Sequence, residues 1–299
     1  MAHAKSRLSR AAAAFAVAAV AAAGATFPVG DAPAADAAAV TACGFTDLQL
    51  SPDLDGDGYG DLLGVRSDGA LLRWSFTAES TLGDSNLLAA SGFAGHKVYG
   101  PGDWNGDGYN DVVSVDPSGL LWLYVNDGKG GIGPRLEIGH GWVPFRIIPA
   151  GDMNVDGAND LLAIDQQGRL WLYMGTGRGG FKPQPKPVGQ GWINIELYAA
   201  GDLAKDGVND ILAIRQDGTL WAYNGRGNGT FTVARNVGRG WGAFELESGA
   251  DLNGDGRADI VGRNNATGDL FYYQGNGGGS FQAAKLIGTG FGATNNCKP

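Results

Sequence analysis

The chain alternates short apolar runs with polar turns that are rich in Gly, Asp and Asn. One series of runs is aliphatic, as at residues 161–164 and 211–214, and a second series carries aromatic residues, at 121–124, 170–173, 220–223 and 270–273. Runs of this length, bounded by turn-forming residues, predict β-strands. No stretch beyond the N-terminal region keeps a helical apolar period over three turns. The pattern therefore predicts an all-β protein of many short strands.

The strands follow a repeat that is marked by one nine-residue acidic motif. The motif occurs five times, at residues 53–61, 103–111, 152–160, 202–210 and 251–259, and successive starts are 50, 49, 50 and 49 residues apart. Each motif is followed by the aliphatic run, a turn with Gly, the aromatic run, a Gly-rich turn and a weaker strand. Each repeat then ends on an aromatic residue that follows Gly: Phe93, Trp142, Trp192, Trp241 and Phe291.

A period near 50 residues with about four strands per repeat is typical of a β-propeller blade. We therefore expect residues 38–299 to form one propeller of five four-stranded antiparallel blades. Because the last repeat ends after Phe291, we expect residues 44–52 to supply its missing strand, so that N- and C-terminal strands pair and close the ring. A β-solenoid is the alternative architecture.

The two ends of the chain carry secretion and disulfide signals. Residues 1–37 combine early basic residues, an Ala-rich run over 11–23 and small residues before Ala38, which is the pattern of a secretory signal peptide. A second cleavage site follows Ala34, and a membrane anchor is the alternative, although the run is short for a span. The mature protein is then secreted, and its only cysteines, Cys43 and Cys297, are expected to form a disulfide rather than stay free.

The composition of the chain limits the classes of partner that the protein is expected to bind. Gly accounts for 52 of 299 residues and the formal net charge is −9, but sixteen of the 31 acidic residues lie inside the five motifs. An acidic chain is a poor match for nucleic acid or an anionic membrane. Because the acid is concentrated in the motifs, the charge points to bound cations rather than to a basic partner.

The spacing of the motif fits a calcium loop. Side-chain oxygens at positions 1, 3, 5 and 9 and the carbonyl of position 7 can surround one ion, while Gly at position 6 allows a sharp turn; hard oxygen donors suit Ca²⁺. Position 12 is never Glu and strands follow, so the motif is not an EF-hand. The alternative is a set of plain Asp/Asn/Gly turns. The fourth loop has Ala204 at position 3 beside Lys205, so we expect four strong calcium sites and a weaker or absent fifth.

The D-x-[DN]-x-D-G-x-x-D loops at the start of each repeat resemble those of the FG-GAP/VCBS repeat family, which includes integrin α-chain propellers and many secreted bacterial proteins. The resemblance covers about 44–299 and implies a propeller with Ca²⁺ between the first two strands of a blade. The ligands it implies are Asp53, Asp55, Asp57, Tyr59 and Asp61; Asp103, Asn105, Asp107, Tyr109 and Asp111; Asp152, Asn154, Asp156, Ala158 and Asp160; Asp202, Asp206, Val208 and Asp210; and Asp251, Asn253, Asp255, Arg257 and Asp259, with position 7 giving its carbonyl. The Phe-Gly and Gly-Ala-Pro words of the integrin consensus are mostly missing, and the integrin ligand site does not carry over.

Function is expected to be recognition rather than catalysis. His96 and His140, expected as ordinary surface residues, sit in no nucleophile motif, and no G-x-S-x-G elbow occurs. The chain also resembles fungal and bacterial lectins, which favours a lectin-like module for cell-surface or extracellular glycans, with Trp142, Trp192 and Trp241 as candidate stacking residues; Trp122, Trp171 and Trp221 are expected to be blade core. The alternatives are a subunit of a secreted assembly that binds a protein partner, such as a toxin particle, and a hydrolase of an extracellular polymer.

Overall fold

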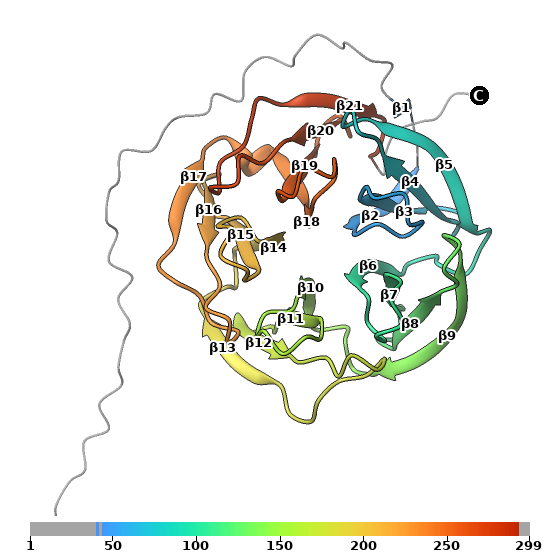
Figure 1. Cartoon of the computed structure of the whole chain (residues 1–299), viewed down its shortest axis with the longest axis horizontal. Coiled ribbons are helices and arrows are strands. Elements are labelled where there is room, and N and C mark those ends of the chain that lie inside the picture. The colour runs from blue at the N-terminus through green and yellow to red at the C-terminus, as the bar shows by residue number, and fades with distance from the viewer. Residues whose placement is uncertain (1–39, 42–43, 293–299) are drawn as a thin grey trace, which may run out of the picture.

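The computed structural model describes residues 40–41 and 44–292, which form five sheets arranged as a ring around a central axis (Figure 1). The predicted signal peptide, Cys43 and Cys297 lie outside the described residues. Within those residues, no helix combines the length and apolar character needed to cross a bilayer.

Each sheet contains a blade of four antiparallel strands that run in sequence order from the axis to the rim. Blade 1 holds β2 (Phe45–Ser51), β3 (Asp61–Arg66), β4 (Leu71–Phe76) and β5 (Leu82–Ala89), and blade 2 holds β6 (Lys97–Gly102), β7 (Asp111–Val115), β8 (Leu121–Asn126) and β9 (Ile132–Gly139). Blade 3 holds β10 (Arg146–Gly151), β11 (Asp160–Ile164), β12 (Arg169–Tyr173) and β13 (Lys186–Gln190). Blade 4 holds β14 (Glu196–Gly201), β15 (Asp210–Ile214), β16 (Leu220–Tyr223) and β17 (Arg235–Gly238), and blade 5 holds β18 (Phe244–Ala250), β19 (Asp259–Asn264), β20 (Leu270–Tyr273) and β21 (Lys285–Thr289). A short 3₁₀ turn, η1 (Trp241–Ala243), precedes β18.

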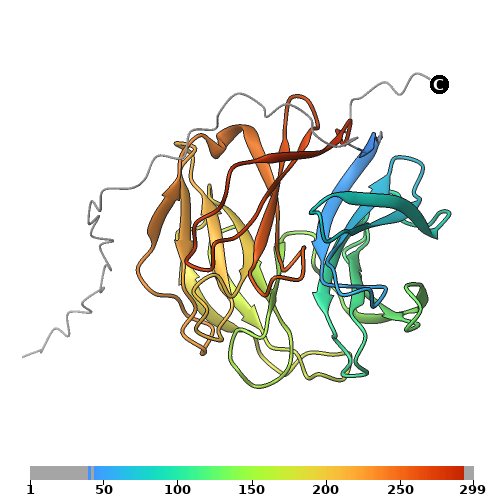
Figure 2. The same ribbon diagram turned by 45° about the horizontal axis from the view of Figure 1, so that its top comes forward.

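The predicted five-bladed propeller is confirmed, but one detail of its closure was wrong. Residues 45–51 do not complete the last blade; they are the innermost strand of blade 1, paired with β3 in the register Leu50↔Leu62. The reason is that each acidic loop is the connection of a hairpin, so the strand before a loop pairs with the strand after it. Closure by terminal strands does occur, because β1 (Val40–Thr41) adds to β21 as a parallel fifth strand (Figure 2).

The core is divided among the five interfaces between neighbouring blades, each with its own cluster of buried side chains. The aromatic residue that ends each repeat is buried in one of these clusters. Phe291, from the end of blade 5, stacks on Phe45 of blade 1 with ring centroids 5.7 Å apart and meets Trp74 edge-on at 5.4 Å. The last repeat therefore closes the ring through side chains as well as strands.

All five acidic loops lie at one end of the ring, because each follows the C-terminal end of an innermost strand. We call this end the loop face. The opposite end, where the innermost strands begin and the second strands turn back, is called the pocket face.

Candidate functional sites

The acidic loops share one backbone conformation, which the position-1 aspartate holds. In every loop its Oδ2 accepts a hydrogen bond from the N–H of the position-6 glycine, over 2.7–2.9 Å. Position 4 takes a positive φ throughout, and it is glycine in three loops but Val155 and Lys205 in the other two, at φ 58° and 57°. The loops therefore keep their shape where glycine is lost.

The position-9 aspartates are buried anchors. Asp61, Asp111, Asp160, Asp210 and Asp259 are at most 1% exposed. In blades 2 to 5 one oxygen accepts an N–H from loop position 2 or 3, and the other accepts an N–H at the end of the third strand or just after it, as in the bonds of Asp160 with Met153 and Gly175 at 3.1 and 3.0 Å. Burial raises the pKa of Asp61 to about 7, and of Asp160, Asp210 and Asp259 to about 6. Buried carboxylates of this kind are stabilised as anions when a cation lies nearby.

The first loop has the donor set that best fits a calcium ion. Oxygens of Asp53, Asp55 and Asp61 lie within 4.8 Å of one another, and no other group of three acidic, His or Cys side chains among the described residues does so. Asp55 Oδ1 and Asp61 Oδ1 are buried and accept no hydrogen bond from the residues described. Carboxylate oxygens left free in this way suit a hard divalent cation.

A buried arginine also reaches the first loop, which the sequence did not indicate. Arg73 of β4 donates to Asp55 Oδ2 at 2.6 Å, and its Nε lies 3.7 Å from Asp61 Oδ1. Its guanidinium is a fixed positive charge at the donors that calcium would use. The first loop is thus both the most acidic and the only one of the described loops with an arginine bonded to its position-3 residue.

Neighbouring loops are joined by hydrogen bonds that the motif spacing alone did not predict. Asn110 Nδ2 donates to the carbonyl of Asp53 at 2.6 Å, and Asn159 Nδ2 donates to that of Asp103 at 3.0 Å, so position 8 of one loop binds position 1 of the preceding loop. Asn159 also packs against the preceding blade, since a Cβ added to Gly102 of that blade would lie only 2.5 Å from Asn159 Nδ2. In the sequence, the Asn-Asp pair that recurs at positions 8 and 9 of the second, third and fourth motifs is the signal that could have indicated these bonds.

The two sets of tryptophans differ in burial from what the sequence predicted. Trp142, Trp192 and Trp241 are only 6–8% exposed and pack against tyrosines of the next blade, at 4.7, 5.2 and 4.9 Å between centroids. Their faces are not open to a sugar, so the stacking role expected for them is wrong. The glycine three residues earlier makes room for each indole, since a Cβ added to Gly139, Gly189 or Gly238 would lie only 2.5–2.8 Å from its Nε1.

The half-buried indoles are those of Trp122, Trp171 and Trp221 on the third strands. Each carries an arginine over its ring, with Cζ to centroid distances of 4.1 Å for Arg135, 5.2 Å for Arg169 and 3.8 Å for Arg215. The indole N–H donates to a neighbouring oxygen at 2.7–2.9 Å, on Asp116, Asp165 or Thr219. The expectation that these residues are blade core holds only for part of each side chain.

In blade 3 this arrangement lines a groove of about 270 Å³ on the pocket face. Its walls combine apolar and aromatic surface from Pro144, Phe145, Trp171, Tyr173 and Pro185 with the polar groups of Asp165 and Arg169. Desolvation raises the pKa of Asp165, but hydrogen bonds from Trp171 and Arg169 outweigh it and lower the pKa to about 2. The groove therefore presents a permanent carboxylate, a guanidinium and an aromatic surface.

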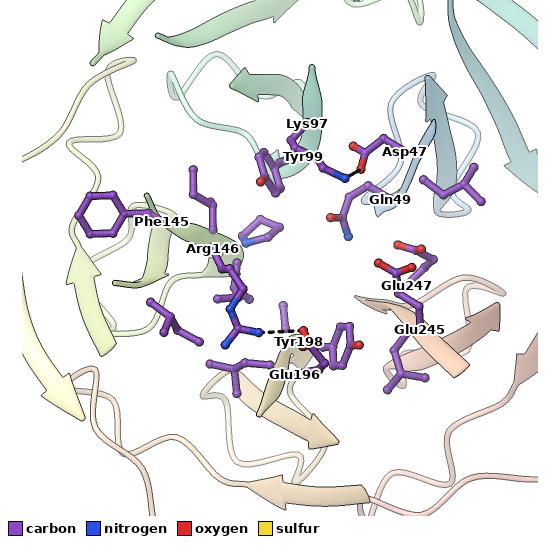
Figure 3. A pocket seen from close by; sticks show the side chains of 18 residues that line it. Asp47, Gln49, Lys97, Tyr99, Phe145, Arg146, Glu196, Tyr198, Glu245 and Glu247 are labelled. Carbon is purple, nitrogen blue, oxygen red and sulfur yellow. Dashed lines mark hydrogen bonds and ion pairs between the residues drawn. The ribbon is translucent and has the colours of Figure 1, made fainter. Parts of the chain in front are cut away.

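A second pocket, of about 240 Å³, lies on the propeller axis at the pocket face (Figure 3). It is ringed by side chains from all five innermost strands and includes Asp47, Gln49, Tyr99, Tyr198 and Glu247. Phe145 lines both this axial pocket and the groove of blade 3, so the two lie side by side.

One of the two histidines expected at the surface, His96, is buried. His96 is not a surface residue; it is 7% exposed, packs beside Phe93 and shares a hydrogen bond of 3.0 Å between its Nδ1 and Ser114 Oγ. Burial lowers the pKa of His96. Ser114 is fully buried as well, so this pair is a packing contact within the interface of blades 1 and 2.

Several solved structures are similar to this chain. A lectin of Agrocybe aegerita, whose structure describes specific recognition of non-reducing terminal N-acetylglucosamine, is 24% identical over 82% of this chain and 67% of its own, with a TM-score of 0.48. The BP39L lectin of Burkholderia pseudomallei is 17% identical over 80% and 69%, at 0.47. The Tc holotoxin pore of Photorhabdus luminescens is 20% identical over 80% of this chain but 12% of its own, at 0.45.

No curated protein matches the sequence. The FG-GAP-like repeat family matches it over residues 103–163, 152–213 and 251–297, which together make up more than half of the chain. These matches take in four of the five acidic loops. The chain belongs to the FG-GAP-like repeat family.

Proposed function

We propose that this protein is a secreted, calcium-stabilised recognition propeller that binds carbohydrate on its pocket face, without catalysis. The observation that carries the proposal is the groove of blade 3, where Arg169 lies over the ring of Trp171 and both side chains donate hydrogen bonds to Asp165, at 2.6 and 2.9 Å. A sugar ring has apolar C–H faces and pairs of hydroxyls; aromatic surface suits the first, and a guanidinium beside a carboxylate suits the second.

Repetition supports this interpretation. Trp122, Trp171 and Trp221 occupy equivalent register positions, opposite Ser114, Ala163 and Ala213 on the neighbouring strands, and each has its arginine. Three similar sites on one rigid ring can engage a repeating polymer together, so weak single contacts add up to useful avidity. We therefore expect polysaccharide to bind more strongly than its monosaccharide.

In this proposal calcium acts at a distance from the ligand. The acidic loops lie on the loop face, and the groove lies on the pocket face, since the turn at 165–169 follows the far end of β11. Calcium then holds the blades together rather than bridging to the sugar. Secretion rests on the signal at residues 1–37, and N-terminal sequencing of protein from the culture medium should start at Ala38.

The test is glycan-array binding by the mature protein, followed by titration with the best glycan. Trp171→Ala should weaken single-site binding about tenfold, the usual worth of an aromatic contact. Asp165→Asn keeps the shape of the groove and should also weaken binding, while Asp84→Asn, at an exposed position on the outer strand of blade 1, is the matched control and should change nothing. Glycan binding that survives both groove variants at unchanged melting temperature would move the site elsewhere.

A protein partner is the second candidate. Val143 and Ile193 follow Trp142 and Trp192 in adjacent blades and are 66% and 61% exposed, which gives the pocket face two equivalent aliphatic contacts. Co-purification from culture supernatant separates the two functions. A stoichiometric partner lost in a Val143→Ser, Ile193→Ser double variant favours assembly, whereas a monomer retained on polysaccharide favours carbohydrate binding.

A further inference from the structure

The axial pocket contains one carboxylate more than its surrounding cations can pair. Four acidic and two basic side chains line it: Asp47, Glu196, Glu245, Glu247, Lys97 and Arg146. Lys97 Nζ is 2.7 Å from Asp47 Oδ1, and Arg146 NH1 is 2.8 Å from Glu196 Oε2, as the dashed lines in Figure 3 mark. Arg263 of β19 pairs with Glu245. The acid that lacks a close partner is Glu247.

Glu247 is buried on the wall of the pocket. It is 3% exposed, and no hydrogen-bond donor among the described residues reaches its Oε1. Arg263 approaches it only to 3.9 Å, from Nε, while its NH2 serves Glu245. Burial and the neighbouring Glu245 raise the pKa of Glu247 well above its ordinary value, against the effect of Arg263. A buried acid whose oxygen lacks a hydrogen-bond donor is costly to folding, and such groups cluster at binding sites.

The shape and donor set indicate which cation could pair with it. Among the described residues, the only three carboxylates close enough to share one metal ion are in the first acidic loop, so the pocket does not form a metal site. Its volume of about 240 Å³ holds an extended alkyl chain, and its walls add Tyr99, Tyr198 and Gln49. An ammonium group has three donors to divide between a carboxylate and an amide oxygen, and it is attracted to aromatic rings.

We propose that the axial pocket binds a primary alkylammonium group, either the end of a lysine side chain or a free polyamine, with Glu247 as its counter-ion. The alkyl stem would lie along the apolar part of the lining, which includes Leu48, Ile148 and Leu246. This site is separate from the carbohydrate groove, and neither proposal depends on the other.

The test is calorimetric titration of the mature, calcium-saturated protein with 1,5-diaminopentane and with Nα-acetyl-lysine methylamide. Nα-acetyl-norleucine methylamide is the matched neutral ligand. We expect one site per protein for each amine and none for the norleucine amide. If 1,5-diaminopentane binds more tightly than the lysine amide, the natural ligand is a free polyamine. If the lysine amide binds equally or more tightly, the natural ligand is a lysine side chain of a partner chain.

Two variants make the assignment specific to Glu247. Glu247→Gln keeps the shape and should weaken amine binding about tenfold or more, the factor for losing a hydrogen bond to a charged group. Lys97→Gln frees Asp47 from its ion pair and should strengthen binding, which no loss of structure would do. Glu137→Gln, an exposed glutamate outside the pocket, is the control. Equal affinity for the norleucine amide, or unchanged amine affinity in Glu247→Gln at an unchanged melting temperature, would overturn the proposal.

Discussion

Arg73 distinguishes the first acidic loop from the others at the level of single residues. The β-register places it opposite Leu63, a position where the other blades hold Leu123, Leu172, Ala222 and Tyr272. Only 6% of its side chain is exposed, and it reaches both Asp55 and Asp61. The loop with the most aspartates therefore contains its own counter-charge.

Replacing this arginine should change how the first loop binds calcium. In Arg73→Leu the competing charge is gone, so we expect calcium to bind the first loop about tenfold more tightly, as measured by calorimetric titration, because one ion pair no longer opposes it. In chelator the same variant should melt lower than wild type, since Asp55 and Asp61 lose their partner. Arg66→Leu, which removes an exposed ion pair with Asp68 in the same blade, should do neither. A variant with unchanged calcium binding would mean that Arg73 and the ion do not compete.

Glu247 should make the free energy of unfolding depend on pH, with a sign that follows from the direction of its pKa shift. Its pKa in the folded protein lies above the ordinary 4.5, so the folded state holds the proton more tightly than the unfolded state. The stability this contributes is complete below pH 4.5 and is lost as pH rises through the folded pKa. Glu247→Gln removes the effect, so its free energy of unfolding should equal that of wild type at pH 4 and exceed it at pH 8.

Comparing wild type with Glu247→Gln isolates the titration of Glu247, because every other charged group around that position is the same in both proteins. The ionisable groups that face Glu247 are Asp47, Lys97, Tyr99, Arg146, Glu196, Tyr198, Glu245 and Arg263. Denaturant unfolding of both proteins across this range is the measurement. A variant that loses its advantage as pH rises would contradict the assignment.

Between elements, Asn110 and Asn159 each link their own acidic loop to the preceding one. Asn159 Nδ2 donates to the carbonyl of Asp103 and covers Gly102, whose φ of 83° marks the β-bulge that turns β6 into its loop. Asn159→Ala should therefore cost about 1–2 kcal/mol of unfolding free energy, since the carbonyl loses its donor and a gap is left. Asn86→Ala, on the exposed outer strand of blade 1, is the control and should stay within 0.5 kcal/mol, roughly the range of neutral surface changes. Equal effects of the two substitutions would remove this link between blades.

The elements could be predicted from the sequence to the extent that local signals define them. The acidic loops, the strands after them and the five-blade ring follow from periodicity and turn chemistry, and the structure confirms them. The roles of the tryptophans did not follow, because Trp142 and Trp171 both stand in strand-like contexts and only the packing of blade 2 on blade 3 decides which is enclosed. Arg73 and Glu247 were missed for a related reason: Arg73 bonds to Asp55 on another element, and the surroundings of Glu247 come from all five innermost strands.

At the scale of the molecule, the ring concentrates negative charge on one face. All five loops lie on the loop face, where sixteen aspartates are brought together. The second loop is also hydrogen-bonded to the first, and the third to the second. We propose that bound cations keep this face compact, so that loss of the ions should loosen the blade interfaces.

Chelation of the mature protein should therefore lower its melting temperature by roughly 10 °C or more, because each ion that binds only the folded state adds its own stabilisation. Scanning calorimetry in chelator, against a sodium chloride control of equal ionic strength, separates ion binding from charge screening. Excess calcium should restore the original transition, and magnesium should restore less of it, since it accepts fewer and more rigidly placed ligands. Because each blade packs its core against both neighbouring blades, we expect one cooperative transition that shifts as a whole rather than separate melting of single blades. An unchanged melting temperature in chelator would show that the aspartates shape the turns without holding metal.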